Sequence, residues 1–291
     1  MAIFLFKSVI LSLTIILNYD IIQSVLIRKN KDNVMNYIKN FWQHRYLLGE
    51  LVKKGIKLKY RRSYLGIIWS LLEPLLTTIV LTIVFGTLFG VKDATFPLYV
   101  LCGRLLFSFF SSGTNGALRS IRANSGMIKK VYVPKYLYPM ASILFNFIIF
   151  LISLIILIPL ALYCHVTPKI SWLYIILPLF LLILLTFGVG MILSTIDVFF
   201  RDMEYLWSVC TLLIMYMSAI FYPPEKLLNS NFGFLLKYNP LFGIIQTFRN
   251  CMLGDPLNWK YIAYAGGFSV ICILVGTVIF YKKQDVFILH I

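Results

Sequence analysis

Ionised side chains are scarce in this sequence, yet four of them gather within eight positions. Asp197, Arg201, Asp202 and Glu204 lie in the stretch STIDVFFRDMEYL, whereas only 13% of the 291 residues are charged. Clustered carboxylates beside a cation are the groups that an acid–base catalyst or an intramembrane proton relay uses. The same residues would also suit a polar turn between two membrane spans. The position of this stretch relative to the bilayer decides between the two interpretations.

The composition predicts an all-α integral membrane protein. Hydrophobic residues make up 60% of the chain, and the mean hydropathy is +0.85, far above the values of soluble domains. Runs of about 18 or more apolar residues indicate transmembrane helices, and the alternation typical of a membrane β-barrel is missing. The formal net charge of +16 would suggest a nucleic-acid partner in a soluble protein. Here its distribution fits membrane orientation instead, so no nucleic acid is expected.

The apolar pattern predicts six membrane spans and an external hairpin. Two shorter apolar pieces, 227–236 and 241–253, lie between the fifth and sixth spans and are separated at Asn239-Pro240. Each piece is too short to cross a bilayer, so we expect a re-entrant hairpin there. The six predicted spans are Ile67–Gly90, Leu98–Leu118, Leu137–Cys164, Trp172–Ile196, Tyr205–Tyr222 and Tyr261–Tyr281.

Basic residues assign the two sides of the membrane. Twenty Lys and Arg residues fall on one side of the predicted spans and six on the other, with Arg104 inside a span. The positive-inside rule therefore places both termini in the cytoplasm of a cell whose cytoplasmic membrane holds the protein.

The chain divides into four predicted regions. Residues 1–34 are an apolar N-terminal extension; no A-x-A-like cleavage site follows its apolar run, and its basic residues come after that run. An upstream extension with Met35 as the natural start, a segment lying on the membrane and a seventh span are the three interpretations. Residues 35–66 form a cytoplasmic amphipathic interface helix, residues 67–283 the six-span domain, and residues 284–291 a cytoplasmic tail.

The topology makes the charged stretch a structural turn on the cytoplasmic side. If the segment is helical, Asp197 and Arg201 are four residues apart and Arg201 and Glu204 three apart, so we expect these side chains to pair with one another. Water at the membrane surface would then hydrate the acids. Neither a histidine nor a serine with a base stands nearby, and the five cysteines and three histidines show no metal spacing. We predict neither a catalytic residue nor a metal site.

Glu73 and Arg104 are the clearly intramembrane charges. Ionisable groups at that depth cost about 2.5–3.5 kcal/mol on insertion scales. Glu73 lies near the inner end of its span and Arg104 near the outer end of the next, so we expect two separate features that face protein or a water-filled passage. Outward snorkelling of Arg104 is the simpler alternative.

Three motifs stand out along the chain: YRRSYLGIIWSLLEPLL, with basic residues, Leu-Gly, a Trp and a Pro at the first span, GVGMILSTIDVFFRDMEYLW at the end of the fourth span, and KYNPLFGIIQTFRNCML near the C-terminus. Together they resemble the membrane subunits of type 2 ABC exporters, and within these the family that exports polysaccharides such as O-antigen, capsule and teichoic acid. The resemblance covers about Tyr37 to Lys283.

The resemblance implies a homodimeric pore with two separate cytoplasmic ATPase subunits. This sequence has no G-x-x-x-x-G-K-[ST] motif to hold a nucleotide, so ATP and Mg²⁺ are expected in the partner chain, and this chain is expected to be neither an enzyme nor a cofactor protein. The implied ATPase-coupling surface is the basic loop after the second span, although these cations would also serve membrane orientation alone. They are Arg122, Lys129, Lys130 and Lys135.

The implied cargo is a lipid-linked polysaccharide or teichoic acid. Arg104 would contact an anionic group of such a cargo, with Glu73 on the same pathway, and aromatic rings would stack on sugars. An aromatic belt at the membrane interface is the alternative reason for those rings. The predicted aromatic residues of the pathway are Phe107, Phe110, Tyr216 and Tyr222.

Three rival functions differ in their requirements. An ABC permease for a drug or another lipid would keep the architecture and change the cargo. An ion-coupled secondary transporter would need several intramembrane acids and paired repeats. A membrane-embedded transferase for lipid-linked sugars would need a catalytic carboxylate or a metal site near the interface.

Overall fold

The computed structural model describes residues 34–61, 63–90, 93–131, 133–167, 169–228 and 233–291. The predicted N-terminal extension lies outside these residues except for Val34. The chain divides into two units, residues 1–46 and residues 47–291, and the long apolar helices found among the described residues lie in the second unit. Within the described residues every regular element is a helix, so the predicted all-α class is confirmed.

The described helices follow one another through the chain with short connections. Helix α2 begins at Val34 in the first unit and continues to Tyr60 in the second. The remaining elements are η1 (Gly66–Ile68), α3 (Trp69–Phe89), α4 (Phe96–Ala123), α5 (Ser125–Ile128), α6 (Leu137–Leu154), α7 (Leu157–Tyr163), η2 (Ile170–Ile175), α8 (Ile176–Phe199), α9 (Met203–Tyr216), α10 (Pro224–Leu228), α11 (Gly233–Lys237), α12 (Pro240–Leu253), α13 (Trp259–Lys283) and α14 (Phe287–His290).

Five of the six predicted spans coincide with helical segments long and apolar enough to cross a membrane. Among the described residues these segments are Gly66–Phe89, Phe96–Ala123, Leu137–Tyr163, Ile170–Phe199 and Trp259–Lys283. Their lengths could be predicted because about 30 Å of hydrocarbon requires about 20 helical residues.

The predicted span Tyr205–Tyr222 is shorter in the structure than in the sequence analysis. Helix α9 ends at Tyr216 after 14 residues, and the chain then turns through Ala219, whose φ of 46° is left-handed. Fourteen residues rise about 21 Å, which is less than the hydrocarbon thickness of a bilayer. Helix α9 is therefore apolar without meeting the length of a full span.

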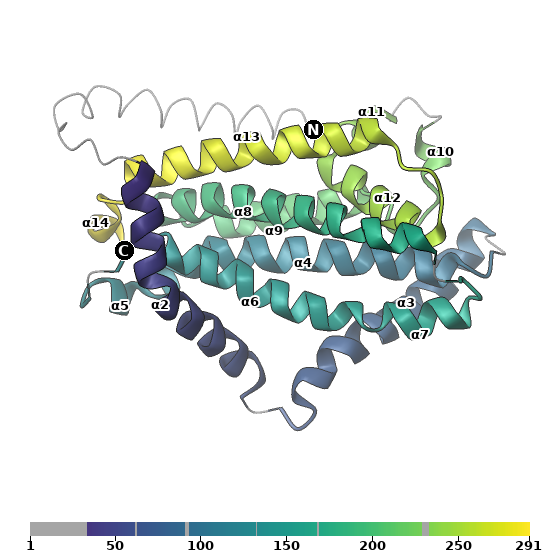
Figure 1. The fold of residues 1–291 in the computed structure, drawn as a ribbon, viewed down its shortest axis with the longest axis horizontal. Coiled ribbons are helices and arrows are strands. Elements are labelled where there is room, and N and C mark those ends of the chain that lie inside the picture. The colour runs from purple at the N-terminus through teal and green to yellow at the C-terminus, as the bar shows by residue number, and fades with distance from the viewer. Residues whose placement is uncertain (1–33, 62, 91–92, 132, 168, 229–232) are drawn as a thin grey trace. The chain divides into compact units, whose positions relative to one another are not determined.

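Helix α4 lies at the centre of the second unit. Its most apolar window is 67% buried, against 11% for the segment that contains α3, and it packs on α3, α6, α8, α9 and α12. Helices α4, α6, α8 and α13 run alongside one another (Figure 1). The core therefore forms around α4, whereas α3 is the most exposed of the long helices.

Helices α8 and α13 touch through glycine. A Cβ atom added at Gly188 would lie 2.7 Å from backbone atoms of Cys272 and Ile273, and one added at Gly276 would lie 2.7 Å from the carbonyl oxygen of Gly188. Small residues of this kind let the backbones of membrane helices approach closely. The two backbones are therefore in direct contact at this crossing.

Two apolar residues of the predicted amphipathic helix, both in the second half of α2, are buried against the rest of the protein. Leu48 and Val52 are both 8% exposed, and Gly55 has no side chain where the ring of Phe145 approaches from α6. The chain then turns at Gly66, whose φ of +51° is left-handed, and enters η1 and α3. At least these two apolar residues of the helix are therefore covered by the protein itself.

The predicted break at Asn239-Pro240 is the start of α12. The Asn239 side-chain oxygen accepts hydrogen bonds from the backbone N–H groups of Leu241 and Phe242 at 3.0 and 3.4 Å, and Pro240 occupies the first helical position. Both choices are typical of a helix N-terminus. The described residues of the first predicted piece belong to α10, which ends at Leu228, and to α11, which begins at Gly233.

Replacing Gly188 with alanine should destabilise the contact between α8 and α13. The added methyl group meets backbone atoms that cannot rotate away, and overpacking of this kind costs about 1–3 kcal/mol. Unfolding of the purified protein in detergent, followed by circular dichroism, measures the change. Gly267→Ala on α13 is the matched control, since nothing lies within 4 Å of its added Cβ. Equal stability of both variants would contradict the close backbone contact.

Candidate functional site

A polar cavity of about 100 Å³ lies among α3, α4, α6 and the end of α2. Its walls combine ionisable groups, hydroxyls and an amide with the aromatic rings of Trp69, Phe109 and Phe150. Such a mixture is unusual among long apolar helices, because each unpaired polar group there is costly. The polar lining residues are Lys59, Tyr60, Ser70, Glu73, Thr77, Arg104, Ser108, Ser112, Asn146 and Ser153.

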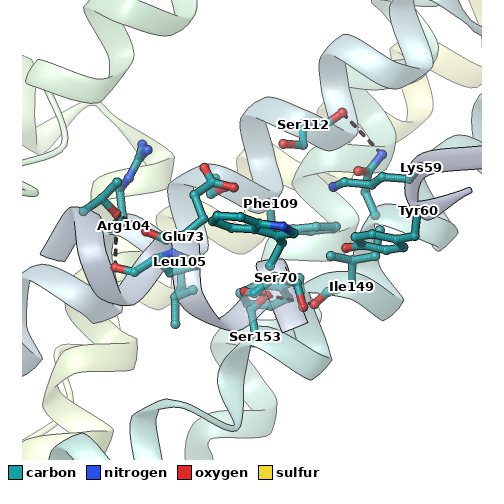
Figure 2. Close-up of a pocket in the computed structure, with 16 residues that line it drawn as sticks. Lys59, Tyr60, Ser70, Glu73, Arg104, Leu105, Phe109, Ser112, Ile149 and Ser153 are labelled. Carbon is teal, nitrogen blue, oxygen red and sulfur yellow. Dashed lines mark hydrogen bonds between the residues drawn. The ribbon is translucent and has the colours of Figure 1, made fainter. Parts of the chain in front are cut away.

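The cavity brings together the two intramembrane charges that the sequence analysis treated as separate. Glu73 of α3 and Arg104 of α4 line the same cavity, and in the view of Figure 2 Glu73 lies between Arg104 and the pair Lys59 and Tyr60. No ion pair joins Glu73 to Arg104 or Lys59 in the described part of the chain. The predicted lack of direct pairing is thus confirmed, but the two charges share one site.

Hydrogen bonds between helices hold the walls of the cavity. Ser153 Oγ of α6 donates to the Ser70 carbonyl of α3 at 2.8 Å, and Asn146 Nδ2 donates to the Ser112 carbonyl of α4 at 3.4 Å. The hydroxyl of Tyr60 is buried and has no hydrogen-bond partner among the described residues. The cavity therefore keeps a donor that the protein does not satisfy itself.

The aromatic residues predicted to line a substrate pathway lie in two different environments. Phe107 and Phe110 are 5% and 3% exposed and belong to the core around α4. Tyr216 is exposed at the end of α9, and its carbonyl accepts a hydrogen bond of 2.6 Å from the Tyr222 hydroxyl. Neither pair lines the cavity, so the structure separates these rings from Glu73 and Arg104.

The charged stretch that interrupts the apolar chain forms an ion-pair network with α4. Arg122 Nε and Nη2 donate to the two carboxylate oxygens of Asp197 at 2.6 and 2.8 Å, and Nη2 also donates to Glu204 at 2.8 Å. Arg119 contacts the other oxygen of Glu204 at 2.6 Å. This network, which we call the α4–α8–α9 clamp, joins the last turns of α4 and α8 to the first turn of α9.

The predicted pairing of Asp197 and Glu204 with Arg201 is wrong. It assumed one continuous helix, but α8 ends at Phe199 and Phe200 is extended, so the four-residue spacing no longer places Arg201 beside Asp197. Arg201 and Asp202 lie exposed in the turn. The expectation of water around every acid is wrong as well, because Asp197 is fully buried.

The geometry of the clamp favours a structural role over catalysis. Both oxygens of Asp197 accept charge-assisted hydrogen bonds from one guanidinium, which is the strongest common form of ion pair. A carboxylate that is fully buried against a guanidinium presents no surface to a substrate. The clamp therefore fits the predicted structural turn, and the arginines that pair with its acids come from α4.

The basic residues of the predicted coupling surface are not equivalent. Arg122 belongs to the clamp, whereas Lys129 and Lys130 are exposed after α5. Lys135 Nζ donates to the Gln284 carbonyl and lies 5.9 Å from the ring centroid of Phe287. Burial lowers the pKa of the Lys135 ammonium, although the charge of Asp285 acts in the opposite direction.

The sequence analysis missed Arg249, which it counted among the charges of the external side. This residue of α12 is 1% exposed and donates to three backbone carbonyls, those of Tyr99, Ala219 and Ile220, at 3.0–3.2 Å. Its guanidinium carbon lies 3.4 Å from the ring centroid of Tyr99. The available signal was a single arginine in the otherwise uncharged stretch 241–253, with Gly103 providing the space for it.

Comparison with known proteins adds a family to this geometry. Residues 46–253 match the family described as ABC-2 type transporter. The chain is 30% identical over 242 residues to the O-antigen export system permease protein RfbA of Klebsiella pneumoniae, a match that covers 82% of this chain and 92% of the relative. It is 24% identical to the RfbA of Myxococcus xanthus, over 87% of this chain and 98% of the relative. It is 23% identical to the polysialic acid transport protein KpsM of Escherichia coli, over 81% and 92%.

Replacing Arg122 with glutamine should destabilise the protein by about 3–5 kcal/mol, because Asp197 would stay buried without its counter-charge. The midpoint of unfolding in detergent measures this loss. Arg201→Gln removes an equal charge from the same region, and we expect no change there, since Arg201 is exposed. A smaller loss for Arg122→Gln than for Arg201→Gln would contradict the clamp.

Replacing Arg249 with methionine should destabilise the region where α4 begins. Three carbonyls would lose a donor, of which that of Ala219 keeps the Tyr99 hydroxyl, and each buried group left unsatisfied costs about 1–3 kcal/mol. Limited proteolysis after residue 216 and the unfolding midpoint report the effect. Lys260→Met removes an exposed cation and serves as the control. Protease resistance equal to that of the parent would show that Arg249 does not hold these segments.

Proposed function

This chain belongs to the ABC-2 type transporter family, and we propose that it is the membrane-spanning, pore-forming subunit of an exporter for a lipid-linked polysaccharide. The observation that carries the proposal is the extent of the match. Two O-antigen export permeases and a polysialic acid transport protein align over about four-fifths of this chain and at least 92% of their own lengths. The alignments therefore include the buried helices as well as the short motifs.

The pore forms between two copies of this chain, and α3 faces it. This helix is the least buried of the long ones, and it carries the exposed carboxylate of Glu73 between the exposed apolar side chains of Trp69 and Leu76. Exposing that carboxylate to lipid would cost about 2.5–3.5 kcal/mol at mid-depth. A polar passage between two copies removes this cost.

A separate ATPase supplies the energy. Nucleotide and Mg²⁺ bind to that partner, and this chain performs no covalent chemistry. Lys129 and Lys130, which are exposed beside the clamp, and the basic second half of α2 form the surface on which the ATPase acts. Because the clamp joins α4, α8 and α9, a push at this surface moves three helices together.

The topology has six spans with both termini in the cytoplasm of a bacterial cell. Helix α9, together with the turn from Met217 to Tyr222, counts as the fifth of the six spans, and α10, α11 and α12 form a re-entrant segment on the external side. The burial of α12 on most of its surface fits a helix that enters the protein rather than lipid.

Co-expression with a candidate ATPase subunit from the same cell tests the function. The strain must make a lipid-linked glycan and lack its own exporter, and antibody labelling of intact cells measures the glycan at the surface. We expect surface glycan only when both chains are present. The purified complex should hydrolyse ATP, whereas this chain alone should not.

A variant of the ATPase without its P-loop lysine is the control, and it should abolish surface glycan without changing the amount of this chain in the membrane. Export that continues with this variant would overturn an ATP-driven mechanism and favour ion coupling. Failure of the two chains to copurify would overturn the partner assignment.

A further inference from the structure

We propose that the cavity among α3, α4 and α6 binds the phosphate group of a lipid-linked substrate through Arg104 and Lys59. The inference rests on the proposed function, and it assigns a specific site and a chemical group to it. Figure 2 shows the two cations at opposite ends of the cavity with Glu73 between them.

The size of the cavity excludes passage of a polymer and suits a single charged group. A cavity of about 100 Å³ holds several water molecules, because about 10–15 Å³ of such space is enough for one. A phosphate group has five heavy atoms and fits this space, whereas a chain of sugars does not. The cavity is therefore a place where one group docks, and the glycan itself must pass elsewhere.

The charges of the cavity favour an anion. Lys59 and Arg104 outnumber Glu73, and neither cation forms an ion pair in the part of the chain that the structure describes. Arg104 is half-buried on the most buried helix, where an uncompensated cation is costly. A phosphate neutralises the excess charge and offers the oxygen pairs that a guanidinium binds in two places at once.

Hydroxyl groups complete the set of donors. The buried Tyr60 hydroxyl has no partner among the described residues, and the hydroxyl of Ser108 lines the cavity one helical turn from Arg104. A phosphate oxygen can accept hydrogen bonds from both. Binding would therefore satisfy a donor that the protein leaves unsatisfied.

Glu73 sets the strength of binding. Its carboxylate repels a phosphate, so it weakens the site without removing the excess positive charge. A transporter must release what it binds, and an acid between two cations provides a site of limited affinity. Removal of this charge should tighten binding, which distinguishes the proposal from a general structural role of the cavity.

The surroundings of the cavity favour a phosphate carried by a lipid over a free one. Glu73 and Trp69 of the lining are exposed on α3, and the same helix continues with exposed apolar residues, including Leu76, Val80 and Ile83. The carboxylate of Glu73 then meets the polar passage, and the apolar residues beyond it on α3 can take the alkyl chain attached to the phosphate. Inorganic phosphate makes no use of it.

Titration calorimetry of the purified full chain in an uncharged detergent tests the proposal with monododecyl phosphate as the probe. We expect saturable binding, at least tenfold weaker for Arg104→Gln and Lys59→Gln and several-fold tighter for Glu73→Gln. Lys57→Gln, an exposed lysine on the same helix as Lys59 and outside the cavity, is the matched control and should bind like the parent. Size-exclusion profiles check that each variant is folded. If the Arg104→Gln variant does not fold, binding by the Lys59→Gln variant tests the site.

Two further probes distinguish the sources of the anion. Dodecanol should not bind, and inorganic phosphate should bind at least tenfold more weakly than the dodecyl ester. Equal binding of dodecanol, or unchanged affinity in both Lys59→Gln and Glu73→Gln, would overturn the phosphate site. Equal binding of inorganic phosphate would overturn the lipid-borne ligand. None of these results depends on the ATPase, so a failure here leaves the proposed exporter intact, and a failure to copurify with an ATPase leaves the site intact.

Discussion

The bond between Arg122 and Asp197 is the constraint on which the arrangement of the helix ends depends. A carboxylate with no exposed surface is stable only beside a counter-charge that satisfies its oxygens, and a single guanidinium does so here through two bonds. The pair therefore fixes the rotation of α4 and α8 about their own axes. Glu204 then sets the direction in which α9 begins, because it shares the same arginine.

A second arginine, Arg249, holds the opposite end of α4 by hydrogen bonds to backbone carbonyls. Arg249 has no carboxylate beside it; it donates to three carbonyls and lies over the ring of Tyr99 near the start of that helix. The carbonyl of Ala219 accepts from both Arg249 and the Tyr99 hydroxyl, in a turn where Ala219 has left-handed φ. Helix α4 is thus held at its first and last turns, and Arg104, which lies between them, remains available to a ligand.

The parts of this structure that depend on the bilayer could be predicted from the sequence, and those that depend on pairing could not. Hydrocarbon thickness sets the length of an apolar run, which is why five predicted spans coincide with long apolar helices. Asp197 and Arg122 are 75 residues apart, and no local spacing indicates that they meet. Local spacing favoured Arg201 instead, and the extended residue Phe200 removed that partner. The burial of Arg249 was missed for a related reason, since a charge count treats every arginine as hydrated.

The contact of backbone with backbone at Gly188 and Gly276 limits how this protein can change shape. Interlocked side chains can exchange rotamers and let two helices slide, but two backbones in contact have no such freedom. Helices α8 and α13 should therefore travel as one rigid body through a transport cycle, and α4 should follow because the clamp ties it to α8. Helix α3, the least buried of the described long helices, and the left-handed turn of Gly66 that precedes it lie outside this block. The lining of the cavity is divided across that boundary, with Glu73 on α3 and Arg104 on α4.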